Sequence, residues 1–152
     1  MRFSIAKLLF ATAVVAVFLG LRNGYVFGFH TDLRTTVERA WWATWIMSVV
    51  VSAIGCAQAP LDTPRRMIVV NATLAGGLAA AISAAILGFE IAEGIHAAYP
   101  DYWRWGFDYL YFAVFFVGRG LLFGAAIGAI IGSIWGVSSP RRRNAAKVNE
   151  SR

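Results

Sequence analysis

Charged side chains are scarce in this sequence. Lysine, arginine, aspartate and glutamate make up 14% of its 152 residues, against about a quarter of the residues in soluble domains. Hydrophobic residues make up 59%, and the mean hydropathy is +0.61. A soluble domain of this length could not bury so much apolar surface, because small domains keep a large share of their surface in contact with water. The composition therefore indicates a membrane protein.

Cysteine and proline are also few. The single cysteine, Cys56, excludes an intrachain disulfide. It lies in an apolar segment, which disfavours the thiolate, so we expect an inert buried thiol. The prolines fall between apolar runs and separate them: Pro60, Pro64, Pro100 and Pro140. No catalytic, nucleotide-binding or metal-binding motif stands out, so we expect neither an enzyme nor a bound cofactor.

Long apolar runs dominate the rest of the chain. They cover residues 4–28, 40–58, 67–90 and 109–137, and a helix needs about 20 apolar residues to cross a bilayer. We predict an all-α polytopic membrane protein, a four-helix transmembrane bundle over residues 1–137. The first run also fits a signal peptide, but its long apolar core and the lack of a cleavage site favour an uncleaved anchor.

The basic residues set the expected orientation. With both termini in the cytoplasm, nine lysine and arginine residues lie inside and four lie outside, as the positive-inside rule requires. The inner set is Arg2, Lys7, Arg65, Arg66, Arg141, Arg142, Arg143, Lys147 and Arg152; the outer set is Arg22, Arg34, Arg39 and Arg104. An aromatic belt is then expected on the outer side, formed by Trp41, Trp42, Trp45, Tyr99, Tyr102, Trp103, Trp105, Tyr109 and Tyr111.

The basic tail, residues 138–152, is expected to be disordered and cytoplasmic. A pI near 10.1 and a net charge of +6 could indicate a nucleic acid partner. However, most of the excess charge flanks the apolar runs, and no aromatic residue interrupts the tail. We therefore expect contact with the lipid bilayer and its anionic headgroups, not with nucleic acid. The expected location is a bacterial inner membrane.

The last run carries a stripe of glycines at every fourth position: Gly120, Gly124, Gly128, Gly132 and Gly136. Residues four apart share one helix face, so the stripe forms a groove without side chains. A weaker small-residue stripe in the third run includes Gly76 and Ala80. We predict small-xxx-small (GxxxG-type) packing between these two runs. The groove could instead serve a homo-oligomer or another membrane protein.

Two segments resemble known bacterial sequences. The opening MRFSIAKLLFATAVVAVFLGL is similar to the leaders of many small bacterial membrane proteins, which implies an anchor. The segment GAAIGAIIGSIWG resembles the glycine zippers of bacterial envelope proteins and some channels. That resemblance implies close helix association, within one chain or between chains.

Arg119 lies inside the last apolar run, where a charge requires a partner or an aqueous route. By a rise of about 1.5 Å per residue, Arg119 and Glu90 lie roughly 27 Å and 34 Å from the cytoplasmic ends of their runs. An arginine side chain can reach across that difference. We therefore predict an intramembrane ion pair between Arg119 and Glu90.

A metal site is a weaker possibility on the third run. Glu90, Glu93 and His96 recur every three residues, and Glu-x-x-His places a carboxylate beside an imidazole, as in di-metal bundles. Such sites need a second motif of this kind, which the chain lacks. His30, Asp101 and Asp108 could complete a mononuclear site, but a solvated helix end is favoured.

Three function classes remain open. The leading one is a structural membrane protein that acts through assembly or association with another membrane component. A channel or transporter subunit is the alternative, with Arg119 and Glu90 lining a polar path. The third is a membrane-embedded enzyme acting at the outer face.

Overall fold

The computed structural model describes residues 5–26, 33–60, 63–98 and 107–138, and this part of the chain is helical without strands. The helices are α1 (Ile5–Gly20), α2 (Leu33–Gln58), α3 (Arg65–Ala98) and α4 (Phe107–Ser138). A short π-helical segment, η1 (Leu21–Val26), extends α1. The all-helical prediction is confirmed. The predicted basic tail, except Ser138, and the connection over residues 99–106 lie outside the described residues.

Three helices are long and apolar enough to cross a membrane, judged by length and composition. They are Arg34–Gln58, Arg65–His96 and Val114–Val137, and a shorter apolar helix covers Ala11–Val26. Prolines mark the boundary between the second and third helices as predicted. The Pro64 carbonyl accepts the first backbone hydrogen bond of α3, from the Met67 N–H at 2.9 Å.

Two helices extend beyond their predicted runs. The apolar run at residues 40–58 lies within α2, which adds a polar turn at its N-terminal end, and α3 continues beyond the run at residues 67–90 to Ala98, as far as the sequence is compatible with a helix. In α2 the added turn contains Arg34 and Glu38, whose side chains pair four residues apart at 3.2 Å. Such pairs stabilise an exposed helix end. Hydropathy alone misses the first turn of α2 because it is polar.

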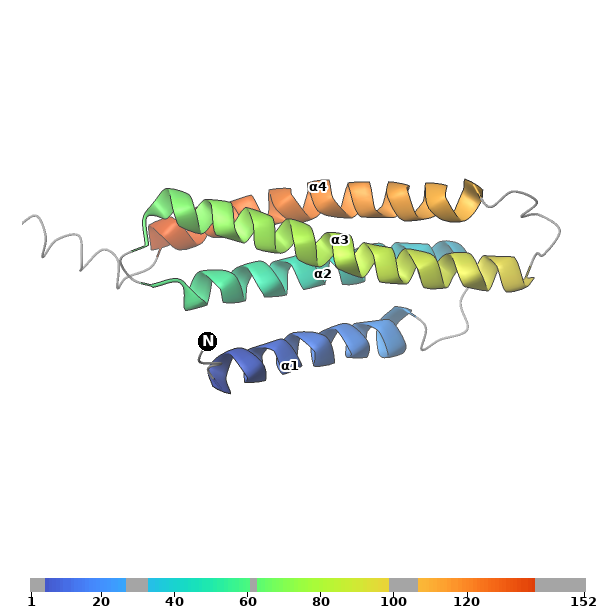
Figure 1. The fold of residues 1–152 in the computed structure, drawn as a ribbon, viewed down its shortest axis with the longest axis horizontal. Helices are drawn as coiled ribbons and strands as arrows, with labels where there is room; N and C mark the ends of the chain where they lie inside the picture. Colours follow the sequence, from blue (N-terminus) through green and yellow to red (C-terminus); the bar gives the residue numbers. More distant parts are fainter. Residues whose placement is uncertain (1–4, 27–32, 61–62, 99–106, 139–152) are drawn as a thin grey trace, which may run out of the picture.

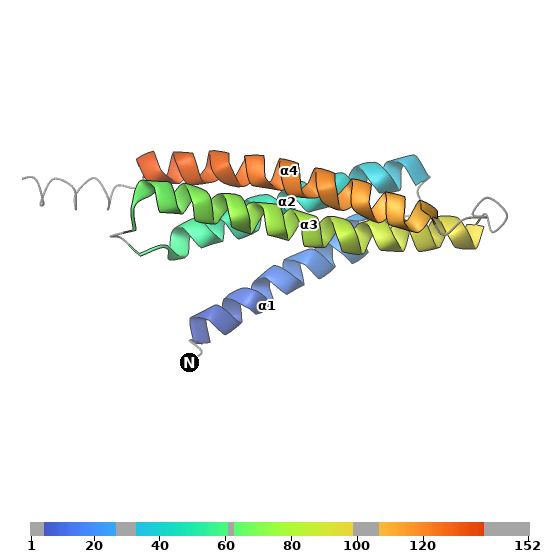
Figure 2. The same cartoon turned by 45° about the horizontal axis from the view of Figure 1, so that its top comes forward.

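Helices α2, α3 and α4 form a bundle, and α1 stands partly apart from it (Figure 1). α3 runs antiparallel to its neighbours and shares its most extensive interface with α4. α1 diverges from the bundle toward its N-terminal end and approaches it at its C-terminal end (Figure 2). The fold is therefore a three-helix core with a loosely attached fourth helix.

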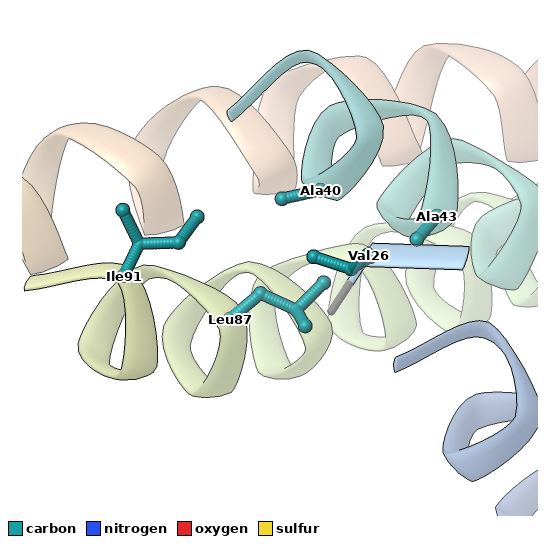
Figure 3. Close-up of a cluster of buried hydrophobic side chains, with 5 residues drawn as sticks. All are labelled: Val26, Ala40, Ala43, Leu87 and Ile91. Carbon is teal, nitrogen blue, oxygen red and sulfur yellow. The ribbon is translucent and has the colours of Figure 1, made fainter. Parts of the chain in front are cut away.

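Val26, at the end of η1, attaches α1 to the core. Its side chain is fully buried. It belongs to a cluster with Ala40 and Ala43 of α2 and Leu87 and Ile91 of α3 (Figure 3). A second cluster, at the other end of the core, contains Cys56, Ile68 and Ala72. Cys56 is buried there, as the sequence predicted.

Most of the buried side chains of the core are small, although Ile68, Leu87 and Phe116 are also buried, and many large apolar side chains lie on its outside. The fully or nearly fully buried residues include Ala40, Ala43, Ser48, Ser52, Ala72, Ala80, Ala84 and Ala92. The most exposed large apolar residues include Leu74, Leu78, Ile82, Leu122, Ile130 and Ile134. This distribution allows the three helix backbones to approach one another closely.

Candidate functional site

The glycine stripe of α4 faces α3. Gly120, Gly124, Gly128 and Gly132 are buried, and Gly136 is half-buried. A Cβ atom added at Gly128 would collide with the carbonyl oxygen of Ala72, and one added at Gly132 would lie 2.9 Å from the Cα atom of Val69. Both obstacles are backbone atoms, which cannot move aside as a flexible side chain can. Only glycine fits at these two positions.

Gly76 and Ala80 line the same seam from the α3 side. A Cβ atom at Gly76 would lie 2.6 Å from the carbonyl oxygen of Gly124. The methyl group of Ala80 is fully buried and occupies the space beside Gly124. The residues that the sequence singled out on the two runs therefore meet in one interface.

Hydroxyl groups of α2 join this seam. Ser48 donates a hydrogen bond to the carbonyl oxygen of Gly124 at 3.1 Å, and Ser52 donates one to that of Ala72 at 3.2 Å. Both serines are fully buried. Their small side chains bring α2 close to both partner helices, and both hydroxyl groups are hydrogen-bonded. The spacing of four residues places Ser48 and Ser52 on one helix face, but the sequence does not show which carbonyl groups they reach, because both acceptors belong to other helices.

Glu90 pairs with Arg22 of η1, not with Arg119. The Arg22 Nη2 atom lies 2.5 Å from Glu90 Oε1, and Arg22 Nε lies 2.6 Å and 2.9 Å from the two carboxylate oxygens. This forked contact ties the end of α1 to α3, next to the Val26 cluster. The pair predicted between Glu90 and Arg119 is replaced by this one.

Helix rotation explains the change of partner. Gly88 faces α4, since an added Cβ atom would lie 3.3 Å from the Cβ atom of Phe116. Glu90 follows two residues later, which is about 200° further around a helix of 3.6 residues per turn. Its side chain therefore points away from α4 and toward η1. The distances of Glu90 and Arg119 along their helices are compatible with a pair, but distance along a helix does not show in which direction a side chain points.

The side chain of Arg119, a residue of α4, lines a pocket together with side chains of α2. Arg119 directly precedes Gly120, which faces α3, so its side chain is turned about 100° from that seam. Its guanidinium group stacks over the Phe115 ring, 4.4 Å from the ring centroid. No carboxylate pairs with it among the side chains that the structure describes. Arg119 is thus a cation on an apolar helix without an acidic partner in this part of the chain.

Arg119, which is itself exposed, forms part of the wall of an open pocket of about 350 Å³. Its walls are formed by Glu38, Trp41, Trp42, Trp45, Arg119 and Phe123. Trp41 stacks on Phe116 with ring centroids 4.7 Å apart, which fixes α2 against α4 at this level. The Nε1–H of Trp45 is buried and has no acceptor among the described residues. The pocket therefore offers a cation, with a carboxylate at its edge.

The weak metal candidates do not form a cluster in the described part of the chain. No three carboxylate, imidazole or thiol groups there lie close enough together to hold a metal ion. Glu90 is engaged by Arg22, whereas Glu93 and His96 are exposed. His30 and Asp101 lie outside the described residues, and nothing is described of the Asp108 side chain.

An apolar groove of about 480 Å³ separates α1 from the core. Val14 and Phe18 of α1 form one wall, and Met47 of α2 with Leu78 and Ile82 of α3 form the other. The groove is lined by α1, α2 and α3, and Figure 2 shows that α1 diverges from the other two helices toward its N-terminal end. Its lining carries almost no polar atoms, so it has no chemistry for catalysis.

Comparison of the chain with known protein families, with curated proteins and with solved structures found no match. Its function is therefore inferred from the geometry alone.

Proposed function

We propose that this chain is a multi-pass protein of a bacterial inner membrane, with four spans and both termini in the cytoplasm. Its role is structural: the α2–α4 core is held by GxxxG-type packing, and its outer surfaces associate with other membrane components. The observation that carries this proposal is the distribution of side-chain sizes between the inside and the outside of the core.

This distribution suits lipid better than water. Leu122 is 72% exposed, Ile134 61% and Leu78 57%. Such an apolar exterior would be unfavourable in water and would promote aggregation. In a bilayer it needs no cover, and helices associate through small residues and interhelical hydrogen bonds instead. The buried serines and the glycine seam are what this environment favours.

The arrangement of the helix ends supports the proposed orientation. The N-terminal ends of α1 and α3 and the C-terminal ends of α2 and α4 lie at one end of the molecule (Figure 1). Arg65 and Arg66 begin α3 at that end, whereas Trp41 and Trp42 lie toward the opposite end of α2. Arginines on the cytoplasmic side and tryptophans at an interface are the expected pattern.

The geometry favours packing within one chain as the role of the glycine stripe. α3 already occupies the groove that the stripe forms, so this face is not free for a second copy. Partners would contact the outward faces of the helices or α1. The channel alternative has less support, because Arg119 and Glu90 have different neighbours and do not line one path within a single chain.

Reporter fusions test the membrane topology. Fusions after Gly136 and after Pro64 should both report a cytoplasmic location, and a fusion after Asp101 should report the outer side. An outer location after Gly136 would overturn the four-span orientation. Full release of the chain by alkaline carbonate would overturn membrane integration itself.

Site-specific photo-crosslinking tests the structural role. A photoreactive residue at exposed Leu78 or Leu122 should give discrete protein adducts in native membranes, identified by mass spectrometry. A photoreactive residue in place of Val114, which is also exposed, shows how far along α4 the contact with the partner protein extends. Adducts to lipid alone from all three positions would contradict association with a protein partner.

A further inference from the structure

We propose that the pocket around Arg119 binds the headgroup of a zwitterionic aminophospholipid, with the phosphate on Arg119 and the ammonium group near Glu38. This inference rests on the proposed membrane integration. It gives a role to the pocket between α2 and α4, which helix packing by itself does not explain.

Arg119 supplies the phosphate contact. Its guanidinium group is held over Phe115, which fixes its position without neutralising its charge. A cation on an apolar helix requires an anion or water, and no described carboxylate pairs with it. The planar guanidinium group donates parallel hydrogen bonds to phosphate oxygens, which suits a phosphodiester.

Trp45 supplies an aromatic wall. Its side chain lines the same pocket as Arg119, and tryptophan is typical of the membrane–water interface, where lipid headgroups lie.

The ring contacts between α2 and α4 set the relative heights of the two charges. Trp41 is level with Phe116, and Trp45 lies beside Phe123, with centroids 5.9 Å apart. The residues in these two contacts are 75 and 78 positions apart in the sequence. The same two separations place Glu38 of α2 level with residues 113–116 of α4. Arg119 is three to six residues deeper, which is about 5–9 Å at 1.5 Å per residue. In an aminophospholipid the phosphate is likewise deeper than the ammonium group.

Glu38 remains able to accept an ammonium group. It is paired with Arg34 at 3.2 Å, but the two side chains are 60% and 86% exposed, so water and salt weaken that pair. Trp42 is 54% exposed beside it, and an aromatic face attracts a cation. A lipid with only negative charge would meet the Glu38 carboxylate at this position.

The lower wall of the pocket is apolar. Phe123 is 50% exposed and lines the pocket one helical turn below Arg119. An acyl chain that continues from the phosphate would run along this ring and along Leu122, which is 72% exposed. A free phosphate ion would leave that surface unused. The pocket therefore matches a whole lipid better than a soluble anion.

Native mass spectrometry of the full chain, released from nanodiscs of equal phosphatidylethanolamine and phosphatidylglycerol, tests the proposal. The wild-type protein should retain phosphatidylethanolamine preferentially. Arg119→Gln should reduce retention of both lipids about tenfold, the change expected from one lost charge-assisted hydrogen bond. Glu38→Gln should remove the preference without abolishing binding. Arg66→Gln, at an exposed arginine in the first turn of α3, is the matched control and should leave the preference for phosphatidylethanolamine unchanged.

Several results would overturn the site. They are equal retention by Arg119→Gln and Arg66→Gln, a wild-type preference for phosphatidylglycerol, and saturation of the site by inorganic phosphate alone. Arg119→Lys keeps the charge and should retain more lipid than Arg119→Gln, which keeps the proposal testable if the neutral variant unfolds. Failure of the wild-type chain to remain in carbonate-washed membranes would instead contradict the proposed membrane integration.

Discussion

The carbonyl oxygen of Ala72 occupies the position that a side chain at residue 128 would need. The α3 backbone therefore lies directly against the α4 backbone at Gly128. A glycine in a helix has a poor intrinsic helix propensity, and here the close approach compensates for it. This contact is the tightest of those along the glycine stripe.

Replacement of Gly128 by alanine should destabilise the core by about 1–3 kcal/mol, the usual range for overpacking. The added methyl group meets backbone atoms, so one of the two helices must shift. The measurement is the free energy of unfolding in detergent or nanodiscs.

Gly118→Ala is the matched control on the same helix. An added Cβ atom there has no neighbour within 4 Å among the described residues. Alanine should therefore be neutral there or stabilise the helix by up to about 1 kcal/mol through its better helix propensity. Equal effects of Gly118→Ala and Gly128→Ala would mean that the seam is not tight.

The Arg22–Glu90 pair should show coupling in a double-mutant cycle. Arg22→Leu and Glu90→Leu each leave one charge without its partner, whereas the double variant leaves none. We expect the two single effects to be non-additive, as for residues in direct contact. Thermal unfolding in detergent measures all four proteins.

The same cycle distinguishes the two candidate partners of Glu90. Arg119→Leu and Glu90→Leu should add to within about 0.5 kcal/mol, as independent sites do. Strong coupling between Arg119 and Glu90, with none between Arg22 and Glu90, would restore the pair predicted from depth and contradict the observed one.

Ser48 should tolerate removal of its hydroxyl better than enlargement. Ser48→Ala loses the hydrogen bond to Gly124, which is worth about 0.6 kcal/mol on average between membrane helices. Ser48→Val adds volume where α2, α3 and α4 meet and should cost about 1–3 kcal/mol. Val49→Ala, on the exposed side of α2, is the control. A Ser48→Val protein as stable as the wild type would show that this junction is loose.

Val26→Ala should loosen α1 from the core. Ile→Val, which removes one buried methylene, costs about 0.5–1.5 kcal/mol, so we expect roughly twice that for Val26. Hydrogen exchange should rise in α1 and η1 and change little in α3 and α4. Val15→Ala, at a position that is 55% exposed, should be silent. Unchanged exchange in α1 would mean that other contacts hold it.

The sequence alone determined the helices and the small-residue faces. Apolar run length and the prolines are local properties, so they located α2, α3 and α4 and the break at Pro64. Spacing of four residues is also local, which is why Gly124 and Gly128 were correctly predicted on one face. The polar first turn of α2 escaped prediction because it is paired by charge and carries no hydropathy signal.

The tertiary structure decided which polar groups meet. Glu90 and Arg119 are compatible in depth, but the rotation of α3 turns Glu90 toward Arg22, and that of α4 turns Arg119 toward Trp45. In the sequence, Arg22 served only as one of the basic residues that set the membrane orientation, because no local pattern shows that η1 packs beside α3. Rotation and tilt depend on how whole helices pack. Close contacts such as that between Ala72 and Gly128 fix the rotation and tilt of the helices, and these in turn determine which ion pairs can form.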